Sequence, residues 1–283
     1  MRPATGSGKA VAFWEARMLS KEQPALATSA SMREFDGKVA LITGGGSGIG
    51  LGVARAFASA GAQVAIAGRT AATLMRAAAQ IEEACGTSVL ATPADVGDPA
   101  DCERVVAASI DRFGALDVLV NNAALFAWIP LVDAEPAETR RFLRVNVEGP
   151  LNLSRAFAKW AFAHGRGGAI VNISSIAGSR PALNLGLYCA SKAALESLTR
   201  VMALEWAGRG MRANAVAPGH VLTEGVIEDF RSGRLDEKAI LSATPAGRVG
   251  DADDVAEAVL YLASDRARHI VGHVLTVDGG EGL

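Results

Sequence analysis

The sequence is poor in cysteine, in aromatic residues and in an excess of charge of either sign. Three of its 283 residues are cysteines, 5% are aromatic, and the 20% that are charged leave a formal net charge of −2. Cys85, Cys102 and Cys189 form no CxxC pair and no cluster with histidine, which argues against a disulfide framework and against a zinc or other metal site. The balanced charge, without a basic tract, gives no support for nucleic acid or an anionic membrane surface as a partner.

Long apolar runs are also missing. The longest uncharged central stretch, residues 118–132, is interrupted by Asn121, Asn122 and Pro130 and is shorter than the ~20 residues of a membrane-spanning helix. The first 31 residues contain no continuous apolar segment of the kind found in secretory signals. We therefore expect a protein without membrane spans that is located in the reducing cytoplasm.

From residue 38 onward, short apolar runs alternate with longer segments of helical period, which is typical of βαβ units in a parallel sheet. The predicted strands are Val39–Thr43, Gln63–Ala67, Ser88–Thr92, Asp117–Asn121, Ala169–Ser174, Arg212–Ala217 and His273–Val277. The predicted helical stretches are Ile49–Ser59, Ala71–Ala84, Pro99–Phe113, Pro136–His164, Gly186–Gly208 and Ala252–Ala263. No linker or repeat divides them, so we predict one α/β domain, a doubly wound seven-stranded parallel sheet with helices on both faces.

Two segments stand apart from this alternation. Residues 1–31, rich in Ala, Ser and Thr, precede any fold signal and are expected to be a disordered extension, with Met32 as the native start and the domain spanning 32–283. Glu224–Val249 lacks a strand pattern and is expected to be an inserted helix-and-loop segment. This insertion is either a lid over a substrate site or a surface connection.

A glycine-rich turn follows the first strand and precedes the first helix. It reads Thr43-Gly-Gly-Gly-Ser-Gly-Ile-Gly50, which fits neither a Walker A loop, nor a G-x-S-x-G elbow, nor a strict G-x-G-x-x-G motif. What remains is glycine at positions 44, 48 and 50. Because a helix N-terminus presents unpaired N–H groups and glycine lets a pyrophosphate approach, the turn is interpreted as a dinucleotide cradle.

The residues after the second strand bear on the choice of dinucleotide. About 20 residues beyond Gly48, where a carboxylate would hold the ribose of NAD, the sequence has Arg69 and Thr70. A guanidinium can pair with a 2′-phosphate, so the sequence favours NADP(H), while NAD(H) stays possible. The alternative is that Arg69 is a solvated residue at the start of a helix.

One of the two tyrosines, Tyr188, stands four residues before Lys192, which places both side chains on one face of the predicted helix. A phenol beside an ammonium group can serve as an acid or base if the cation lowers its pKa from about 10. A solvated helix face would give the same spacing, so this pair alone does not identify a site.

The ordered motifs resemble those of short-chain dehydrogenases/reductases over residues 36–283. The motifs are the glycine turn, Asn121-Asn122-Ala123, Asn146, Ser174-Ser175, Tyr188-x-x-x-Lys192, Pro218-Gly219-His220-Val221-Leu222-Thr223 and Val277-Asp278-Gly279-Gly280. The chain resembles the single-domain members of this family that are similar to 3-oxoacyl carrier-protein reductases. One departure is Ala124, where the family usually has glycine.

The resemblance implies catalytic roles for four residues. Tyr188 would be the general acid in carbonyl reduction and the base in alcohol oxidation, and Lys192 would bind the nicotinamide ribose and lower the Tyr188 pKa. Ser175, in preference to Ser174, would hydrogen-bond the substrate oxygen. Asn146 would hold a water of the proton relay at a helix irregularity.

The resemblance also implies a set of binding residues. Cofactor contacts are expected at Gly44, Ser47, Gly48, Ile49, Gly50, Arg69, Thr70, Asp95, Val96, Asn121, Ala123, Tyr188, Lys192, Pro218, Gly219, Val221 and Thr223. Substrate contacts are expected among Phe126, Trp128, Ala182, Leu183, Asn184 and His220. This mostly apolar set favours a hydrophobic carbonyl compound or acyl thioester over a phosphorylated sugar.

The leading hypothesis is therefore NADP(H)-dependent hydride transfer between nicotinamide and a carbonyl or secondary alcohol. The alternative is an NAD-dependent polyol or secondary-alcohol dehydrogenase, and a more remote one is a non-catalytic nucleotide-sensing protein. A homotetramer, or failing that a dimer, is expected because apolar residues in the two long helical stretches exceed one face. They include Leu151, Leu153, Phe157, Trp160 and Phe162.

Overall fold

Seven runs of apolar residues form the strands of one parallel sheet in the computed structural model, which describes residues 33–283. The strands are β1 (Val39–Thr43), β2 (Gln63–Gly68), β3 (Val89–Pro93), β4 (Val118–Asn121), β5 (Gly168–Ile173), β6 (Met211–Pro218) and β7 (Val274–Val277). Their order is β3-β2-β1-β4-β5-β6-β7, and every neighbouring pair is parallel. The predicted doubly wound sheet is confirmed, with each strand end within one residue of its predicted position.

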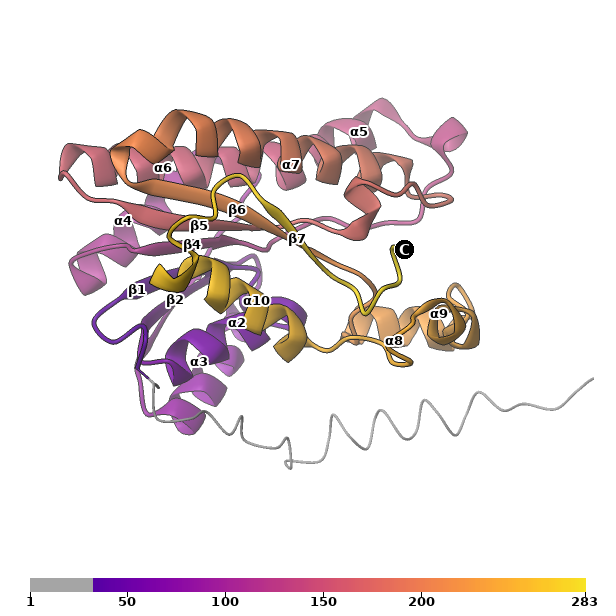
Figure 1. Ribbon diagram of the computed structural model, residues 1–283, viewed down its shortest axis with the longest axis horizontal. Helices are drawn as coiled ribbons and strands as arrows, with labels where there is room; N and C mark the ends of the chain where they lie inside the picture. Colours follow the sequence, from indigo (N-terminus) through magenta and orange to yellow (C-terminus); the bar gives the residue numbers. More distant parts are fainter. Residues whose placement is uncertain (1–32) are drawn as a thin grey trace, which may run out of the picture.

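Helices cover both faces of the sheet (Figure 1). One face carries α2 (Gly48–Ser59), α3 (Ala71–Cys85) and α10 (Ala252–Ala263), and the other carries α4 (Pro99–Phe113), α5 (Pro136–Leu143), α6 (Gly149–Ala163) and α7 (Gly186–Trp206). Alternation along each strand sends neighbouring side chains into separate cores: Ile42 packs with Phe57 on the first face, and Leu41 packs with Phe157 on the second.

The stretch predicted as one helix, Pro136–His164, is broken by a π-helical turn. Arg144–Glu148 forms this turn between α5 and α6. At its centre Asn146 is buried and exchanges hydrogen bonds with the backbone of Leu125, and Pro150 has no N–H to continue the regular ladder. The irregularity expected at Asn146 is therefore present, and the single long helix is corrected to three segments.

The apolar residues that suggested a subunit interface mainly cover the sheet. Leu153 and Phe157 are fully buried in the core, and Leu151, Trp160 and Phe162 pack against it. Their number in the sequence reflects the buried face of α6, so these five residues give no support for an interface.

The insertion after β6 forms two short helices, α8 (Glu224–Arg231) and α9 (Glu237–Ala243), which project from one end of the molecule in Figure 1. Thr223 caps α8 by accepting a hydrogen bond from Val226 N, and Asp236 caps α9. The predicted extension, residues 1–31, lies outside the described residues. Within residues 33–283, no helix has the length and apolar character needed to cross a bilayer.

Candidate active site

A cleft of about 760 Å³ opens at the carboxyl ends of the strands, where the order of a doubly wound sheet reverses between β1 and β4. Such switch points are the usual ligand sites of open α/β sheets, and the volume is in the range of cofactor pockets. Its walls come from the glycine turn, the loops after β2 to β6, and the first turns of α7 and α8. Residues of the glycine turn, of the Ser174-Ser175 and Tyr188-x-x-x-Lys192 motifs and of the segment 218–223 converge on this one cleft, although they are spread over about 180 residues.

The glycine turn forms the floor of the cleft. Gly44 and Gly48 have φ values of 65° and 51°, which favour glycine, and a Cβ on Gly50 would lie 2.2 Å from the Gly44 carbonyl oxygen. Ser47 makes no side-chain cap at the start of α2, and the first turn of that helix has no acidic residue. The N–H groups and positive dipole end of α2 therefore face the cleft in a form that suits a pyrophosphate.

Two residues that were not predicted as site residues hold this turn in place. The Asn122 amide donates to the carbonyl oxygens of Thr43, at 2.9 Å, and of Gly44, at 3.3 Å. In return the Thr43 hydroxyl accepts hydrogen bonds from the backbone N–H groups of Asn122 and Ala123. Both residues belong to the quoted motifs, so their position in those motifs was the available signal.

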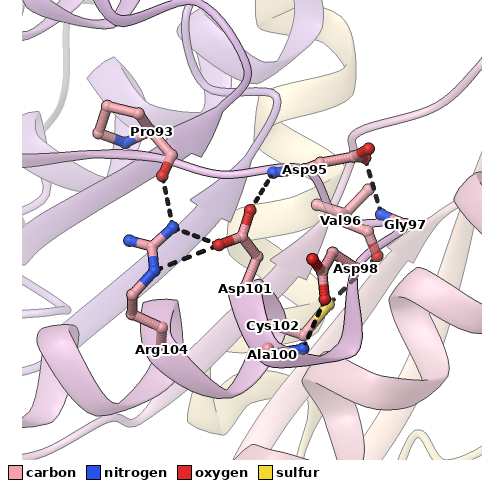
Figure 2. Close-up of polar contacts among 9 residues, drawn as sticks. All are labelled: Pro93, Asp95, Val96, Gly97, Asp98, Ala100, Asp101, Cys102 and Arg104. Atoms are coloured by element: carbon pink, nitrogen blue, oxygen red, sulfur yellow. Dashed lines mark hydrogen bonds and ion pairs between the residues drawn. The ribbon is translucent and has the colours of Figure 1, made fainter.

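The loop after β3 carries Asp95 and Val96 on the opposite wall and is braced from α4 (Figure 2). Asp101 accepts a hydrogen bond from Asp95 N at 2.8 Å and is held by Arg104, which also donates to the Pro93 carbonyl oxygen. These two contacts lower the pKa of Asp101, the Asp95 N–H more than Arg104, so the brace stays ionised.

Asp95 itself has two partners in the protein. One carboxylate oxygen accepts from Gly97 N at 2.9 Å, and the other pairs with Arg144 at 3.3 Å. Arg144 and Arg141 also line the cleft, and neither was predicted. The pairing of Arg144 with Asp95 depends on the packing of the π turn against the loop after β3, which no sequence motif indicates.

Three of the predicted catalytic side chains meet deeper in the cleft. Ser175 follows β5, while Tyr188 and Lys192 occupy the first two turns of α7, and all three line the cleft. The Lys192 ammonium is buried and donates to the Ile173 carbonyl oxygen at 2.7 Å. Phe126 stands edge-on to the Tyr188 ring, with centroids 5.0 Å apart, and gives the substrate end an apolar wall.

The acid–base properties of this group differ from the expectation. Burial raises the pKa of Tyr188 to about 12, although a hydrogen bond with Ser175 opposes the rise. Burial also lowers the pKa of Lys192 to about 8, opposed by the charge of Glu196. In the free protein the expected lowering of the Tyr188 pKa by Lys192 is therefore absent, because desolvation of both groups dominates. A neutral phenol is suited to donate a proton.

Asn146 is buried and does not itself line the cleft. Its amide accepts from Leu125 N at 2.7 Å and donates to Leu125 O and to the Ser191 hydroxyl, both at 2.9 Å. Ser191 in turn donates to the Tyr188 carbonyl oxygen. The side chain thus joins the π turn, the β4 loop and α7, and fixes the position of the helix that carries Tyr188.

Most of the predicted cofactor residues line the cleft: Gly44, Ser47, Gly48, Ile49, Gly50, Arg69, Thr70, Asp95, Val96, Ala123, Tyr188, Lys192, Pro218, Gly219 and Thr223. Asn121 and Val221 are buried beside it instead. Asn121 donates to Ser154 and Asn172, and its own carbonyl oxygen, Oδ1, is the buried side-chain atom that has no partner among the described residues.

Of the six residues predicted for the substrate, Phe126 lines the cleft, whereas Trp128, Ala182, Leu183, Asn184 and His220 are not part of its lining. Trp128 donates to Asp229 of α8 at 3.3 Å, which ties the insertion to the loop after β4. Leu183 is 88% exposed, and Asn184, at a φ of 60°, accepts from Ile129 N. His220 contacts Glu281 near the C-terminus at 2.7 Å.

The glycine cradle, the cleft at the β1/β4 switch point and the Ser–Tyr–Lys group form the arrangement expected of a nicotinamide-dependent oxidoreductase. A family model described as Enoyl-(Acyl carrier protein) reductase matches residues 44–281. The chain belongs to the short-chain dehydrogenase/reductase family, and it transfers hydride between a nicotinamide dinucleotide and a carbonyl or secondary alcohol.

Characterised relatives and a solved structure agree with this assignment. The chain is 41% identical to a galactitol 2-dehydrogenase (L-tagatose-forming) of Cereibacter sphaeroides over 87% of this chain and 95% of the relative. It is also 41% identical to a sorbitol dehydrogenase of the same organism, over 87% and 98%. A short-chain type dehydrogenase/reductase from Mycobacterium ulcerans superposes with a TM-score of 0.83 at 33% identity, over 88% of this chain and 90% of that one.

Proposed function

We propose that this protein is an NADP(H)-preferring reductase of ketones, in which Tyr188 donates the proton to the substrate oxygen. The observation that carries the proposal is the convergence of Ser175, Tyr188 and Lys192 in one cleft, with the tyrosine held as a neutral phenol. Ser175 would hydrogen-bond the carbonyl oxygen and Lys192 would hold the nicotinamide ribose. The dinucleotide, when bound, supplies the hydride.

The preference for NADP(H) rests on the end of β2. Arg69 and Thr70 line the cleft directly after this strand, where a carboxylate would favour the ribose hydroxyl of NAD. Arg69 brings a permanent positive charge that can pair with a 2′-phosphate. The glycine turn that ends at Gly50 would hold the pyrophosphate on the α2 N-terminus.

The substrate is proposed to be a ketone with an apolar substituent, because Phe126 lies edge-on to Tyr188 and walls the substrate end of the cleft. A second candidate is the oxidation of a polyol with NAD, which the similarity to the galactitol and sorbitol dehydrogenases favours. The helices α8 and α9 would act as a lid over this substrate.

We also propose that the protein is a homotetramer of the cytoplasm. The apolar side chains of Leu204, 84% exposed, and Val201, 45% exposed, on α7 support an interface on that helix. The three cysteines are unpaired, as in a reducing compartment.

The first experiment is a fluorescence titration of NADPH and NADH with the wild type and with Arg69→Ala. We expect NADPH to bind the wild type at least about tenfold more tightly, roughly 1.4 kcal/mol, and Arg69→Ala to remove that difference. Equal or tighter binding of NADH by the wild type would move the polyol candidate ahead.

The second experiment tests the tyrosine. Tyr188→Phe should abolish turnover of any ketone reduced by the wild type and leave the dissociation constant of NADPH within about threefold, since the phenol supplies a proton and little binding energy. Turnover of Tyr188→Phe at the wild-type rate would refute the proposed mechanism.

A further inference from the structure

Helix α7 faces the end of β5 through three side chains spaced four residues apart. Tyr188 hydrogen-bonds with Ser175, Lys192 donates to the Ile173 carbonyl oxygen at 2.7 Å, and Glu196 accepts from the Ser174 hydroxyl at 2.8 Å. Because residues at i, i+4 and i+8 share one helix face, these three contacts, here called rungs, join one face of α7 to the consecutive residues 173–175 at the end of β5 and directly after it. The first two rungs belong to the proposed catalytic group, and the third does not.

Glu196 is an unusual residue for this position. It is 6% exposed, and burial of a carboxylate is costly unless charge and hydrogen bonds compensate. A Cβ added to Gly178 would lie 2.5 Å from Glu196 Oε1, so the turn after β5 closes directly over the carboxylate. Lys192 one turn earlier and Arg200 one turn later, at 3.7 Å, supply the compensating charge.

We propose that Glu196 is a positioning residue of the reaction: it keeps Lys192 protonated and holds Ser175 in register with Tyr188. The inference rests on the proposed function, in which Lys192 acts as a cation and Ser175 and Tyr188 share the substrate oxygen. Ser174 connects Glu196 to Ser175, since its hydroxyl donates a hydrogen bond to Glu196 and it directly precedes Ser175 in the chain.

The electrostatic part follows from the burial of Lys192, which is 2% exposed. Burial lowers the pKa of Lys192 to about 8, close enough to neutrality that loss of a neighbouring negative charge would discharge the group in the working range. The titratable groups near it on α7 are Tyr188, Cys189 and Glu196. Charged groups on the other walls of the cleft are Arg69, Asp95, Arg141, Arg144 and Glu224.

The test measures the titration of Lys192 directly, by NMR of the free protein labelled with 13C at the lysine side chains, with Lys192→Met to assign the signal. Glu196→Gln keeps an acceptor for Ser174 but removes the charge, so the midpoint of Lys192 should fall by about half a pH unit or more. Arg200→Gln should move it upward, because the carboxylate then acts on Lys192 without its outer partner. Glu205→Gln, an exposed carboxylate on the same helix, is the matched control and should leave the midpoint unchanged.

Kinetics separate the two parts of the proposal. In the pH profile of kcat for NADPH-dependent reduction, Glu196→Gln should shift the decline on the alkaline side to lower pH and leave the maximal kcat nearly unchanged. Ser174→Ala keeps the negative charge of Glu196 but removes its hydrogen bond to residue 174. It should therefore lower the maximal kcat by about threefold to tenfold without shifting the alkaline decline.

An unmoved Lys192 midpoint in both Glu196→Gln and Arg200→Gln would overturn the electrostatic part, and a wild-type maximal kcat in Ser174→Ala would overturn the part that concerns the position of Ser175. Should Glu196→Gln fail to fold, Arg200→Gln still decides the sign, because Arg200 is exposed. The NMR reading needs no turnover, and loss of the proposed function itself would appear separately, as activity in Tyr188→Phe.

Discussion

The raised pKa of Tyr188 makes a prediction that can be read without knowing the substrate. The protein has only two tyrosines, so the Tyr261→Phe variant carries a single phenol whose ionisation is visible by ultraviolet absorbance. An ordinary phenol is half ionised at pH 10, whereas a group with a pKa of about 12 is only about 1% ionised there. The expected result is an almost flat phenolate signal up to pH 10 in the absence of dinucleotide.

The magnitude has a consequence for stability with a definite sign. The native state holds the phenolic proton more tightly than the unfolded chain does, so the free energy of unfolding should fall as pH rises from below 10 to above 12, by about 3 kcal/mol in all. Tyr188→Phe should remove this slope while Tyr261→Phe keeps it. Half-ionisation of Tyr188 at or below pH 10 in the folded, free protein would refute the argument that desolvation dominates at this site.

Three further predictions concern the framework around the cleft. The Arg212 guanidinium donates to the carbonyl oxygens of Leu262, Ala263 and Ser264 at the end of α10. Arg212→Met removes these hydrogen bonds and should lower the free energy of unfolding by about 3 kcal/mol in a denaturant titration. A loss below about 1 kcal/mol, or an equal loss in the surface variant Arg209→Met, would contradict this prediction. Asp101→Ala releases the loop after β3 and should raise the KM for NADPH by about threefold to tenfold with kcat unchanged. Asp111→Ala, at an exposed position of α4, should change neither constant. An unchanged KM in Asp101→Ala would show that the contact between Asp101 and the loop is dispensable. Gly50→Ala forces α2 away from the glycine turn and should weaken NADPH binding at least tenfold in a fluorescence titration, so wild-type affinity would mean that the turn adapts.

The sequence predicts the sheet well because its strands are buried on both faces. A run such as Val39–Thr43, apolar and branched, has few alternatives to a central parallel strand, and the glycine turn after it marks where the first helix begins. That Tyr188 and Lys192 lie together could also be predicted from the sequence, since a spacing of four residues fixes their common helix face.

What the sequence does not predict depends on contacts between distant elements. The irregularity at Asn146 was expected, but the hydrogen bond from Leu125 N that anchors this residue to the loop after β4 was not. The position of Trp128 outside the cleft lining likewise follows from its hydrogen bond to Asp229. The pKa of Tyr188 depends on burial, which spacing does not reveal. The polar link between Glu196 and Ser174 likewise appears only when α7 is docked on β5.

The contact between α2 and α10 bears on how the chain folds as it leaves the ribosome. A Cβ on Gly52 would lie 2.7 Å from the Ala252 Cβ, and Arg55 pairs with Asp253 at 2.5 Å, so the first helix of the cleft is covered by a helix made about 200 residues later. At 5–20 residues per second, synthesis of that span takes roughly 10 to 40 s. During this time the nascent chain must keep the apolar side of α2 exposed, and we expect it to be a substrate for chaperones until residues 252–263 have emerged.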